Sequence, residues 1–424
     1  MLRFLYSGLL ALVAPFFLYS LFAKKTGKPA VGRRWREHFG QTPPIEINEG
    51  VSTKAVVWFH AVSVGEVIAV TPLIKRFVMM HPDKQVVITT TTPTGAEQAA
   101  KLAPDVIHRY MPLDFSFAVR GFLSSIKPSQ LIIVETELWP NTLHQVAKSG
   151  VPIAVINARL SERSCLRYQK VLPIFQWLAS KIDHVLCQHQ DDADRFLRLG
   201  MSKHKVAVTG SVKFDISIEA SVSQKGQQLR HDVGAQRPVW IAASTHQGED
   251  EQVLEAHRRL LQTHPTSLLL LVPRHPERFD DVAALCEKQG FSLVRRTDTN
   301  TAVNHEHNVY LADTMGEMMT LLAASDICFM GGSLLGDKVG GHNLLEPAAL
   351  GIPSLTGPSY FNFTDITKQL IEHNACHVIA DAEALSSILS EWLEQPELLN
   401  SMGDNARQVV AKNKGAIERT LEQL

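Results

Sequence analysis

Short apolar segments alternate with helical segments over most of this chain, and this alternation restricts the fold more than any other feature of the sequence. The apolar segments lack the polar alternation of a half-exposed strand, so they are typical of strands buried on both faces. Segments with helical patterning lie between several of them, such as 66–80 and 190–199. The sequence therefore predicts parallel sheets that are covered by helices on both faces.

The alternation falls into two halves on either side of a polar segment. We expect strands in the first half at 55–59, 86–89, 131–135, 153–157, 185–187 and 206–209, and in the second half at 239–243, 268–272, 309–311, 327–330 and 352–355. Residues 213–237 between the halves are rich in Ser, Gln and Lys, as is typical of an interdomain connection. The prediction is an α/β protein with two similar domains, in which ligands bind at the carboxyl ends of the strands.

Composition excludes several classes of protein. With 45% hydrophobic and 20% charged residues, the 424-residue chain can bury the core of a globular protein of two or three domains. Its formal net charge of −1 provides no overall basic field, so we expect no nucleic acid partner. The five Cys residues are scattered and lack CxxC spacing, which indicates neither a disulfide framework nor a zinc site and fits a reducing compartment.

The N-terminal segment indicates attachment to a membrane. Residues 4–22 carry no charge and are about long enough to cross the hydrocarbon core as a helix kinked at Pro15. The cations that follow this segment place its C-terminal side in the cytoplasm. They are Lys24, Lys25, Lys28, Arg33, Arg34 and Arg36. A cleaved signal peptide and a helix lying in the membrane interface are the alternatives.

A glycine-rich stretch at 331–341 lies between an expected strand and an expected helix at 343–350. A backbone without Cβ atoms can approach a phosphate closely, and the free N–H groups of a helix start attract anions. The stretch is not a P-loop, because Asp337 stands where that motif requires Lys. The alternative is a glycine-rich turn before a helix that is capped by Asn343 and Glu346.

Polar side chains gather where the expected strands of the second half end. Arg274 offers a planar cation whose geometry suits a phosphate group. The hydroxyl groups of Ser244, Thr245 and Ser333 can donate to phosphate oxygens. The carboxylate of Glu346 can accept from the hydroxyl groups of a ribose. Helix capping explains each cluster taken alone, but several clusters at one sheet edge favour a nucleotide site.

Glu66 stands where the first expected strand turns into a helix. Ser63 and Glu66 have the spacing of a capping box, in which each side chain bonds the backbone N–H of the other residue. A carboxylate at a helix N-terminus also stays ionised, so Glu66 is a candidate general base that takes a proton from a hydroxyl group. The two roles do not exclude each other.

Further polar groups follow other strands of the first half. Thr92 lies in a run of hydroxyl side chains at a helix entry, Glu135 ends an apolar strand, and Arg159 adds a cation. Lys213 lies where the two halves meet, a position from which it can reach a ligand from the hinge side. For Thr92, and for Glu137 close to Glu135, helix capping is the alternative.

These segments together closely resemble the bacterial Kdo transferases, which move 3-deoxy-D-manno-octulosonic acid (Kdo) from CMP-Kdo to the lipid A precursor. The resemblance covers nearly the whole chain in family order, and it departs at His38, where Arg is expected. The matching segments are His60-Ala61-Val62-Ser63-Val64-Gly65-Glu66, Glu135-Thr136-Glu137-Leu138-Trp139-Pro140-Asn141, Asn157-Ala158-Arg159-Leu160-Ser161, Thr209-Gly210-Ser211-Val212-Lys213-Phe214-Asp215, Pro273-Arg274-His275-Pro276-Glu277-Arg278, Asp313-Thr314-Met315-Gly316-Glu317 and Gly332-Ser333 through Glu346-Pro347.

The resemblance implies a GT-B glycosyltransferase, with two Rossmann-like doubly wound domains, an active site in the cleft between them and an N-terminal membrane-anchor helix. The domains that we expect are 1–25 as the anchor, 26–212 as the acceptor-binding domain, 213–237 as the linker, 238–404 as the CMP-Kdo-binding domain and 405–424 as a helix that returns to the first domain.

The family analogy makes Glu66 the general base. It places Arg274, Asn343 and Glu346 at donor-binding positions. The other donor-binding candidates are His275, Ser244, Thr245, Met315, Gly316, Ser333 and Lys213, and the acceptor-binding candidates are Ser63, Thr92, Glu135 and Arg159.

The expected reaction is an inverting transfer of Kdo from CMP-Kdo to the lipid A precursor, which needs no metal or other cofactor because cations and helix N-termini stabilise the leaving phosphate. The resemblance places the enzyme at the inner membrane, held by a single N-terminal anchor with the catalytic domains on the cytoplasmic face. The cations after residue 22 suit a phosphorylated lipid, or serve only as a topology signal. The alternatives are a GT-B enzyme that uses a UDP-sugar and a non-catalytic membrane-tethered binder of nucleotide or lipid.

Overall fold

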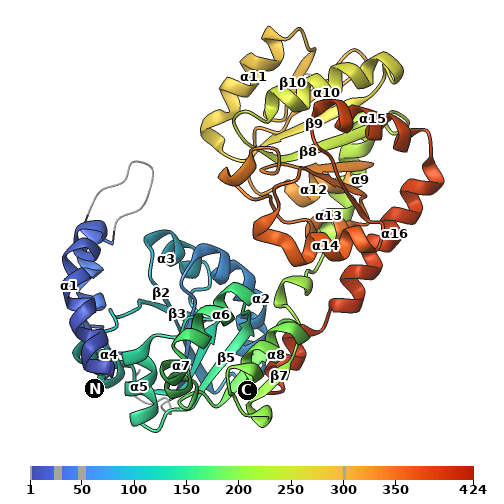
Figure 1. Ribbon diagram of the computed structural model, residues 1–424. Helices are drawn as coiled ribbons and strands as arrows, with labels where there is room; N and C mark the ends of the chain where they lie inside the picture. The colour runs from blue at the N-terminus through green and yellow to red at the C-terminus, as the bar shows by residue number, and fades with distance from the viewer. Residues whose placement is uncertain (1, 23–30, 46–53, 299–301) are drawn as a thin grey trace. The chain divides into compact units, whose positions relative to one another are not determined.

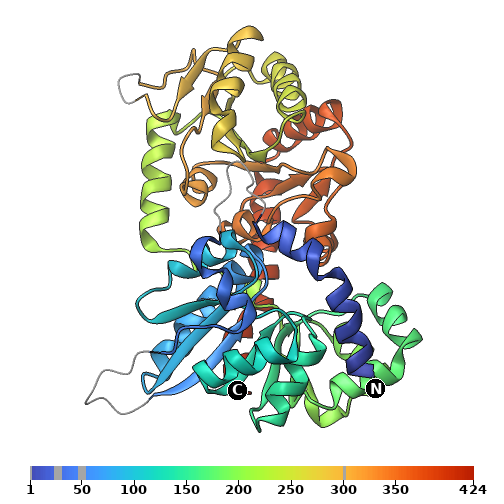
Figure 2. The ribbon, with the colours of Figure 1, turned by 90° about the vertical axis from the view of Figure 1, so that its left-hand side faces the viewer.

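The structure is a computed structural model that describes residues 2–22, 31–45, 54–298 and 302–424 (Figure 1). The chain forms two compact units. Unit 1 contains 1–215 and 415–424, and unit 2 contains 216–414. Helices cover both faces of the sheet in each unit (Figures 1 and 2).

Unit 1 has a seven-stranded sheet of order β3-β2-β1-β4-β5-β6-β7, and all its strand pairs are parallel. Its strands are β1 (Ala55–His60), β2 (Lys84–Thr90), β3 (Val106–Tyr110), β4 (Pro128–Val134), β5 (Ile153–Ala158), β6 (His184–Cys187) and β7 (Val206–Val208). Its helices are α1 (Leu2–Phe22), α2 (Val64–Met80), α3 (Pro93–Ala100), α4 (Ser116–Ile126), α5 (Pro140–Lys148), α6 (Glu162–Lys170), α7 (Leu172–Ala179), α8 (Gln190–Arg198) and α17 (Ala416–Leu421), with short 3-10 helices η1 (Gly32–Phe39), η2 (Lys203–Lys205) and η3 (Val212–Phe214).

Unit 2 has a second seven-stranded parallel sheet, of order β10-β11-β9-β8-β12-β13-β14. Its strands are β8 (Val239–Thr245), β9 (Leu268–Pro273), β10 (Leu293–Arg295), β11 (Val309–Leu311), β12 (Ile327–Met330), β13 (Ser354–Thr356) and β14 (Cys376–Val378). Its helices are α9 (Ala220–Gly234), α10 (Asp250–Thr263), α11 (Phe279–Lys288), α12 (Met318–Ala323), α13 (Leu345–Leu350), α14 (Thr364–Glu372), α15 (Ala382–Leu393) and α16 (Pro396–Asn413), with 3-10 helices η4 (Pro276–Arg278), η5 (Gly336–Lys338) and η6 (Phe361–Phe363).

The apolar segments of the sequence form the buried strands, because both faces of each sheet are covered. Trp58 in β1 and Trp240 in β8 are fully buried, and each belongs to a large hydrophobic core cluster of its unit. All strands expected from the sequence are present within a few residues of their expected ends. The structure adds β3, β10 and β14, which the sequence did not predict.

The polar segment between the halves is largely helical. Helix α9 covers most of 213–237 and belongs to unit 2, where Leu229 and Val233 are buried. At the other end of the chain, α16 stays in unit 2 as far as Asn413. A break at Lys414-Gly415 then starts the return to unit 1, so the residues after 405 do not form one continuous helix.

Helix α1, dark blue in Figures 1 and 2, lies against α5 of unit 1. Among the described residues, no helix combines the length and the apolarity that a membrane span requires, so the expected span at 4–22 is not supported. Lys24, Lys25 and Lys28 lie outside the described residues. Arg34 forms an ion pair with the buried carboxylate of Glu37, so this cation supports the fold of unit 1.

Candidate active site

Glu66 lies in the first turn of α2, directly after the turn that follows β1. The N–H of Val62 donates to Oε2 of Glu66 at 2.7 Å, and the hydroxyl of Ser63 donates to Oε1 at 2.9 Å. The N–H of Glu66 donates in return to Ser63 Oγ at 3.3 Å. The expected capping box is therefore present with one change, because the Glu66 carboxylate accepts from the N–H of Val62 in place of that of Ser63, and these bonds fix the carboxylate at the carboxyl end of the sheet.

The surroundings of Glu66 prepare its carboxylate to accept a proton near neutral pH. Partial burial raises the pKa of Glu66 to about 7, against the hydrogen bonds from Val62 and Ser63 that favour the ionised form. The carboxylates of Glu135 and Glu137 repel the Glu66 charge and contribute to this raised pKa. A base whose pKa lies near the working pH accepts a proton efficiently.

Glu135 and Glu137 follow β4, next to β1 in the sheet. Glu135 has a left-handed backbone, with φ of 60°. Burial raises the pKa of Glu137, while the indole N–H of Trp139 donates to Oε2 of Glu137 at 3.0 Å and lowers it. The structure therefore brings three carboxylates together, of which the sequence singled out Glu66 as the base.

The other acceptor-binding candidates differ in what their side chains do. Thr92 is the N-cap of α3, because its Oγ1 accepts from the N–H of Gly95 at 3.1 Å. Arg159 is exposed after β5. Lys213 is half-buried in η3, where the N–H of Val212 donates to Oδ1 of the fully buried Asn157 at 3.2 Å. Asn157 ends β5, so it connects the Lys213 segment to the carboxyl edge of the sheet.

The glycine-rich turn after β12 already holds an anion of the protein itself. The buried carboxylate of Glu249 accepts from the N–H groups of Gly332 at 2.6 Å, Ser333 at 2.9 Å and Leu334 at 2.9 Å. Gly331 lets the turn pass close to β8, since a Cβ there would lie 2.7 Å from the carbonyl oxygen of Ser244. The N–H groups expected to receive a phosphate are therefore occupied in this structure.

Two donor-binding candidates lie beneath the surface. Thr245 is fully buried, and its hydroxyl donates to Asp250 Oδ1 at 2.7 Å. Ser333 is fully buried too, and its hydroxyl donates to the carbonyl of Met330 at 2.7 Å and accepts from the N–H of Gly357 at 2.8 Å. Both hydroxyls support the loops of the site, and neither is open to a ligand in this structure.

Several candidates do meet at the carboxyl edge of unit 2. Arg274 and His275 follow β9 and are exposed. Arg274 acts on the carboxylate of Glu346, whose pKa is raised by burial and lowered by this cation. Two histidines that the sequence did not single out as binding residues, His246 and His342, join them, with Nε2 atoms 2.8 Å apart.

The remaining donor-binding candidates lie on the loops around this group. Ser244 ends β8 with a left-handed backbone, φ 59°. Met315 and Gly316 are exposed after β11. Asn343 does not form the expected capping box with Glu346, because its Oδ1 accepts from the N–H of Leu345 at 3.1 Å in a turn that precedes α13. The amide of Asn343 is half-buried.

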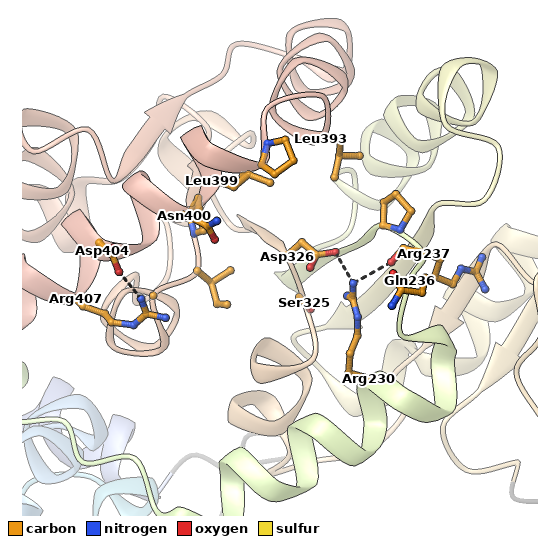
Figure 3. A pocket seen from close by; sticks show the side chains of 15 residues that line it. Arg230, Gln236, Arg237, Ser325, Asp326, Leu393, Leu399, Asn400, Asp404 and Arg407 are labelled. Atoms are coloured by element: carbon orange, nitrogen blue, oxygen red, sulfur yellow. Dashed lines mark hydrogen bonds and ion pairs between the residues drawn. The ribbon is translucent and has the colours of Figure 1, made fainter.

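A cavity of about 520 Å³ lies elsewhere in unit 2, where β8, β12 and β13 begin (Figure 3). Its arginines are bound within the protein: Arg230 pairs with Asp326 at 3.0 Å, and Arg407 pairs with Asp404 at 2.8 Å. The buried Arg237 donates to four backbone carbonyls. This cavity lies at the opposite edge of the sheet from Arg274, and its cations brace the fold.

Comparison with known proteins identifies the two parts of the chain. Residues 33–216 match the family described as 3-deoxy-D-manno-octulosonic-acid transferase (kdotransferase). Residues 237–409 match the family described as glycosyl transferases group 1. The 3-deoxy-D-manno-octulosonic acid transferase of Haemophilus influenzae is 39% identical to this chain, in an alignment that covers 100% of this chain and 98% of the relative. The Bordetella pertussis protein of the same name is 35% identical over 87% of each chain.

Solved structures support the fold. The UDP-GlcNAc 2-epimerase of Neisseria meningitidis has a TM-score of 0.59 over 87% of this chain and 100% of its own, at 15% identity. Anabaena Alr3699/HepE has a TM-score of 0.53 at 12% identity, and the match covers 87% of this chain and 100% of that protein's chain. At these identities the likeness establishes only the fold, two Rossmann-like units as in GT-B proteins. The matches along the sequence go further: the chain belongs to the 3-deoxy-D-manno-octulosonic acid transferase family and is a glycosyltransferase.

Proposed function

We propose that this protein transfers Kdo from CMP-Kdo to the lipid A precursor and inverts the anomeric centre. One observation carries the proposal: Glu66 holds a carboxylate of pKa about 7 at the carboxyl edge of unit 1, in a chain of this family. The carboxylate takes a proton from a hydroxyl group of the acceptor sugar. The oxygen attacks the anomeric carbon of Kdo as the bond from that carbon to the phosphate oxygen breaks, and CMP leaves with the bonding electrons.

The donor binds to the carboxyl edge of unit 2 in this proposal. Arg274 offers the phosphate a planar cation that can donate two hydrogen bonds to its oxygens. Glu346, whose carboxylate interacts with Arg274, accepts from the nucleoside in this proposal, and Asn343 in the turn before α13 donates to it. Cations and N–H donors stabilise the charge that develops on the leaving phosphate, so the transfer that we propose needs no metal.

Unit 1 attaches to the membrane through α1. The side chains of Tyr6 and Ser7 face the protein, since Ser7 Oγ accepts from Asn141 Nδ2 at 3.0 Å and Tyr6 bonds Asp114. The opposite side presents an exposed apolar face of helical spacing, formed by Leu5, Leu9, Leu12 and Val13. Such a face is suited to a lipid surface, which is where a lipid acceptor is found.

The test is a transfer assay with the purified full-length protein, CMP-Kdo and the lipid A precursor. We expect the acceptor to gain the mass of Kdo as CMP is released, and CMP to inhibit more strongly than UMP or UDP. Transfer from a UDP-sugar in place of CMP-Kdo would establish a different donor. Nucleotide binding without turnover on any acceptor would establish a binder and overturn the proposal.

A further inference from the structure

Three histidines meet at the carboxyl edge of unit 2. The ring planes of His246 and His342 are nearly parallel, with an interplanar angle of 7°, and their Nε2 atoms lie 2.8 Å apart. The ring of His275 stands edge-on to His246, with centroids 5.3 Å apart. Gly332 makes room for this arrangement, because a Cβ at that position would lie 2.9 Å from Cδ2 of His342.

Because the N–H groups of the glycine-rich turn are occupied, an anion at this edge is expected to bind these side chains instead. Glu249 takes the N–H groups of Gly332, Ser333 and Leu334, so a phosphate cannot bind them unless Glu249 leaves. Arg278 also lies near the histidines, but it is paired with the buried Asp250. His246, His342, His275 and Arg274 are side chains at this edge that can receive a phosphate.

The histidine pair needs a second Nε2–H group to bind an anion with both rings. At 2.8 Å, two neutral imidazoles share one hydrogen bond, in which one Nε2–H donates and the other Nε2 accepts. A phosphate oxygen that replaces this bond accepts from both rings only when both Nε2 atoms carry a proton. The second donor comes either from a shift of the accepting ring's proton from Nδ1 to Nε2 or from a proton taken from solvent, and only the second route also adds the positive charge that attracts an anion.

The charges around the pair explain why that proton is absent before an anion arrives. The pKa of His342 is lowered to about 4, chiefly by burial and in smaller part by the charges of His246, Arg274 and His275. Burial also lowers the pKa of His246, Glu249 opposes this, and His275, Arg278 and Arg274 add to it. A bound phosphate group offsets these positive charges, with one negative charge in CMP-Kdo and up to two in free CMP, so it favours the protonated pair.

We propose that His246 and His342 receive the phosphate of the nucleotide donor and that the pair takes up one proton as the donor binds. This inference rests on the donor site proposed for unit 2. It makes donor affinity fall as pH rises through neutrality, and it returns a proton to solvent when CMP leaves the site.

The test is calorimetry of CMP binding to the full-length protein in buffers of low and high ionisation enthalpy, at about pH 7.5, where the CMP phosphate is largely a dianion. We expect the wild type to take up close to one proton. We expect His246→Gln and His342→Gln to lose this uptake and to bind CMP at least about tenfold more weakly, the loss of one charge-assisted hydrogen bond. His373→Gln, which changes an exposed histidine on α14, is the matched control and should behave as the wild type.

The outcomes separate this inference from the proposed function. Wild-type protein that binds CMP without proton uptake would overturn the inference, as would Gln variants that bind CMP as tightly as the wild type. Either result leaves the donor site itself in place. Wild-type protein that binds no CMP at all would overturn the donor site, and with it the proposed function. The buffer dependence of the wild type is measured independently of whether the variants fold.

Discussion

Ser63 and Glu66 bond each other in both directions, with the serine hydroxyl donating to Oε1 at 2.9 Å and the Glu66 N–H donating to Oγ at 3.3 Å. The pair therefore closes the start of α2 and also fixes the carboxylate proposed as the base. Glu66→Gln retains an oxygen for the Val62 N–H but cannot take a proton. We expect Kdo transfer to fall by about two orders of magnitude or more, with the melting temperature and CMP binding close to those of the wild type.

Ser63→Ala separates the two roles of this pair. It removes the cap, which costs about 1 kcal/mol of stability, but it leaves the Glu66 carboxylate in place. Transfer should fall far less than in Glu66→Gln. Should Glu66→Gln retain nearly full turnover, Glu66 is only a capping residue, and the base is to be sought at Glu135 and Glu137.

The pKa of about 7 for Glu66 predicts the acid side of the pH profile. The base acts as a carboxylate, so kcat/KM for the acceptor, measured at saturating CMP-Kdo, should rise with pH up to about 7 and level off above it. Glu137→Gln removes a neighbouring negative charge that raises the Glu66 pKa, and it should move this rise to lower pH. The measurement is kcat/KM for transfer between about pH 5 and 9. A rise that stays at the same pH in Glu137→Gln would show that the two carboxylates do not interact.

Glu249 is expected to matter for stability more than any surface carboxylate nearby. Glu249→Ala removes the acceptor for the N–H groups of Gly332, Ser333 and Leu334, and a buried donor without a partner costs about 1–3 kcal/mol. We expect this variant to unfold at a clearly lower urea concentration than the wild type. Glu251→Ala changes an exposed carboxylate of the same helix, α10, and should unfold with the wild type. Equal midpoints for the two variants would mean that the turn does not depend on Glu249.

The sequence predicted the central strands of both sheets and missed strands at their edges. β3, β10 and β14 are edge strands, and their neighbours cover only one side. An edge strand therefore tolerates polar residues, as His108 and Arg109 in β3 show, and it lacks the continuous apolar run that identifies a buried strand. β7, the remaining edge, was predicted because its residues are apolar.

The site was predictable as far as it depends on spacing within one segment. The spacing of Ser63 and Glu66 was enough to predict their capping box, and the strand end at Arg274 was enough to place its side chain at the edge of the sheet. The contact of Glu249 with Ser333 joins residues on two separate loops, so no local pattern reports it. The pairing of His246 with His342 depends in the same way on the order of β8 and β12 in the sheet.

Asp215 fastens the C-terminal segment to unit 1. Its carboxylate accepts from the N–H groups of Gly415 and Ile417 at the start of α17, where free N–H groups favour a negative charge. Asp215 is the last residue before the chain enters unit 2, and Gly415 is the first after it returns.

Asp215→Ala should therefore lower the free energy of locally unfolding the C-terminal segment by about 1–2 kcal/mol. The amides of 415–424 should then exchange hydrogen faster than in the wild type, while those of β1 keep their rate. Glu422→Ala, an exposed change in the same segment, is the control. Equal exchange at 415–424 in both variants would show that α17 is held without Asp215, by the burial of Ile417 and Leu421 in the core of unit 1 and by contacts such as that of Arg419 Nε with the Thr209 carbonyl.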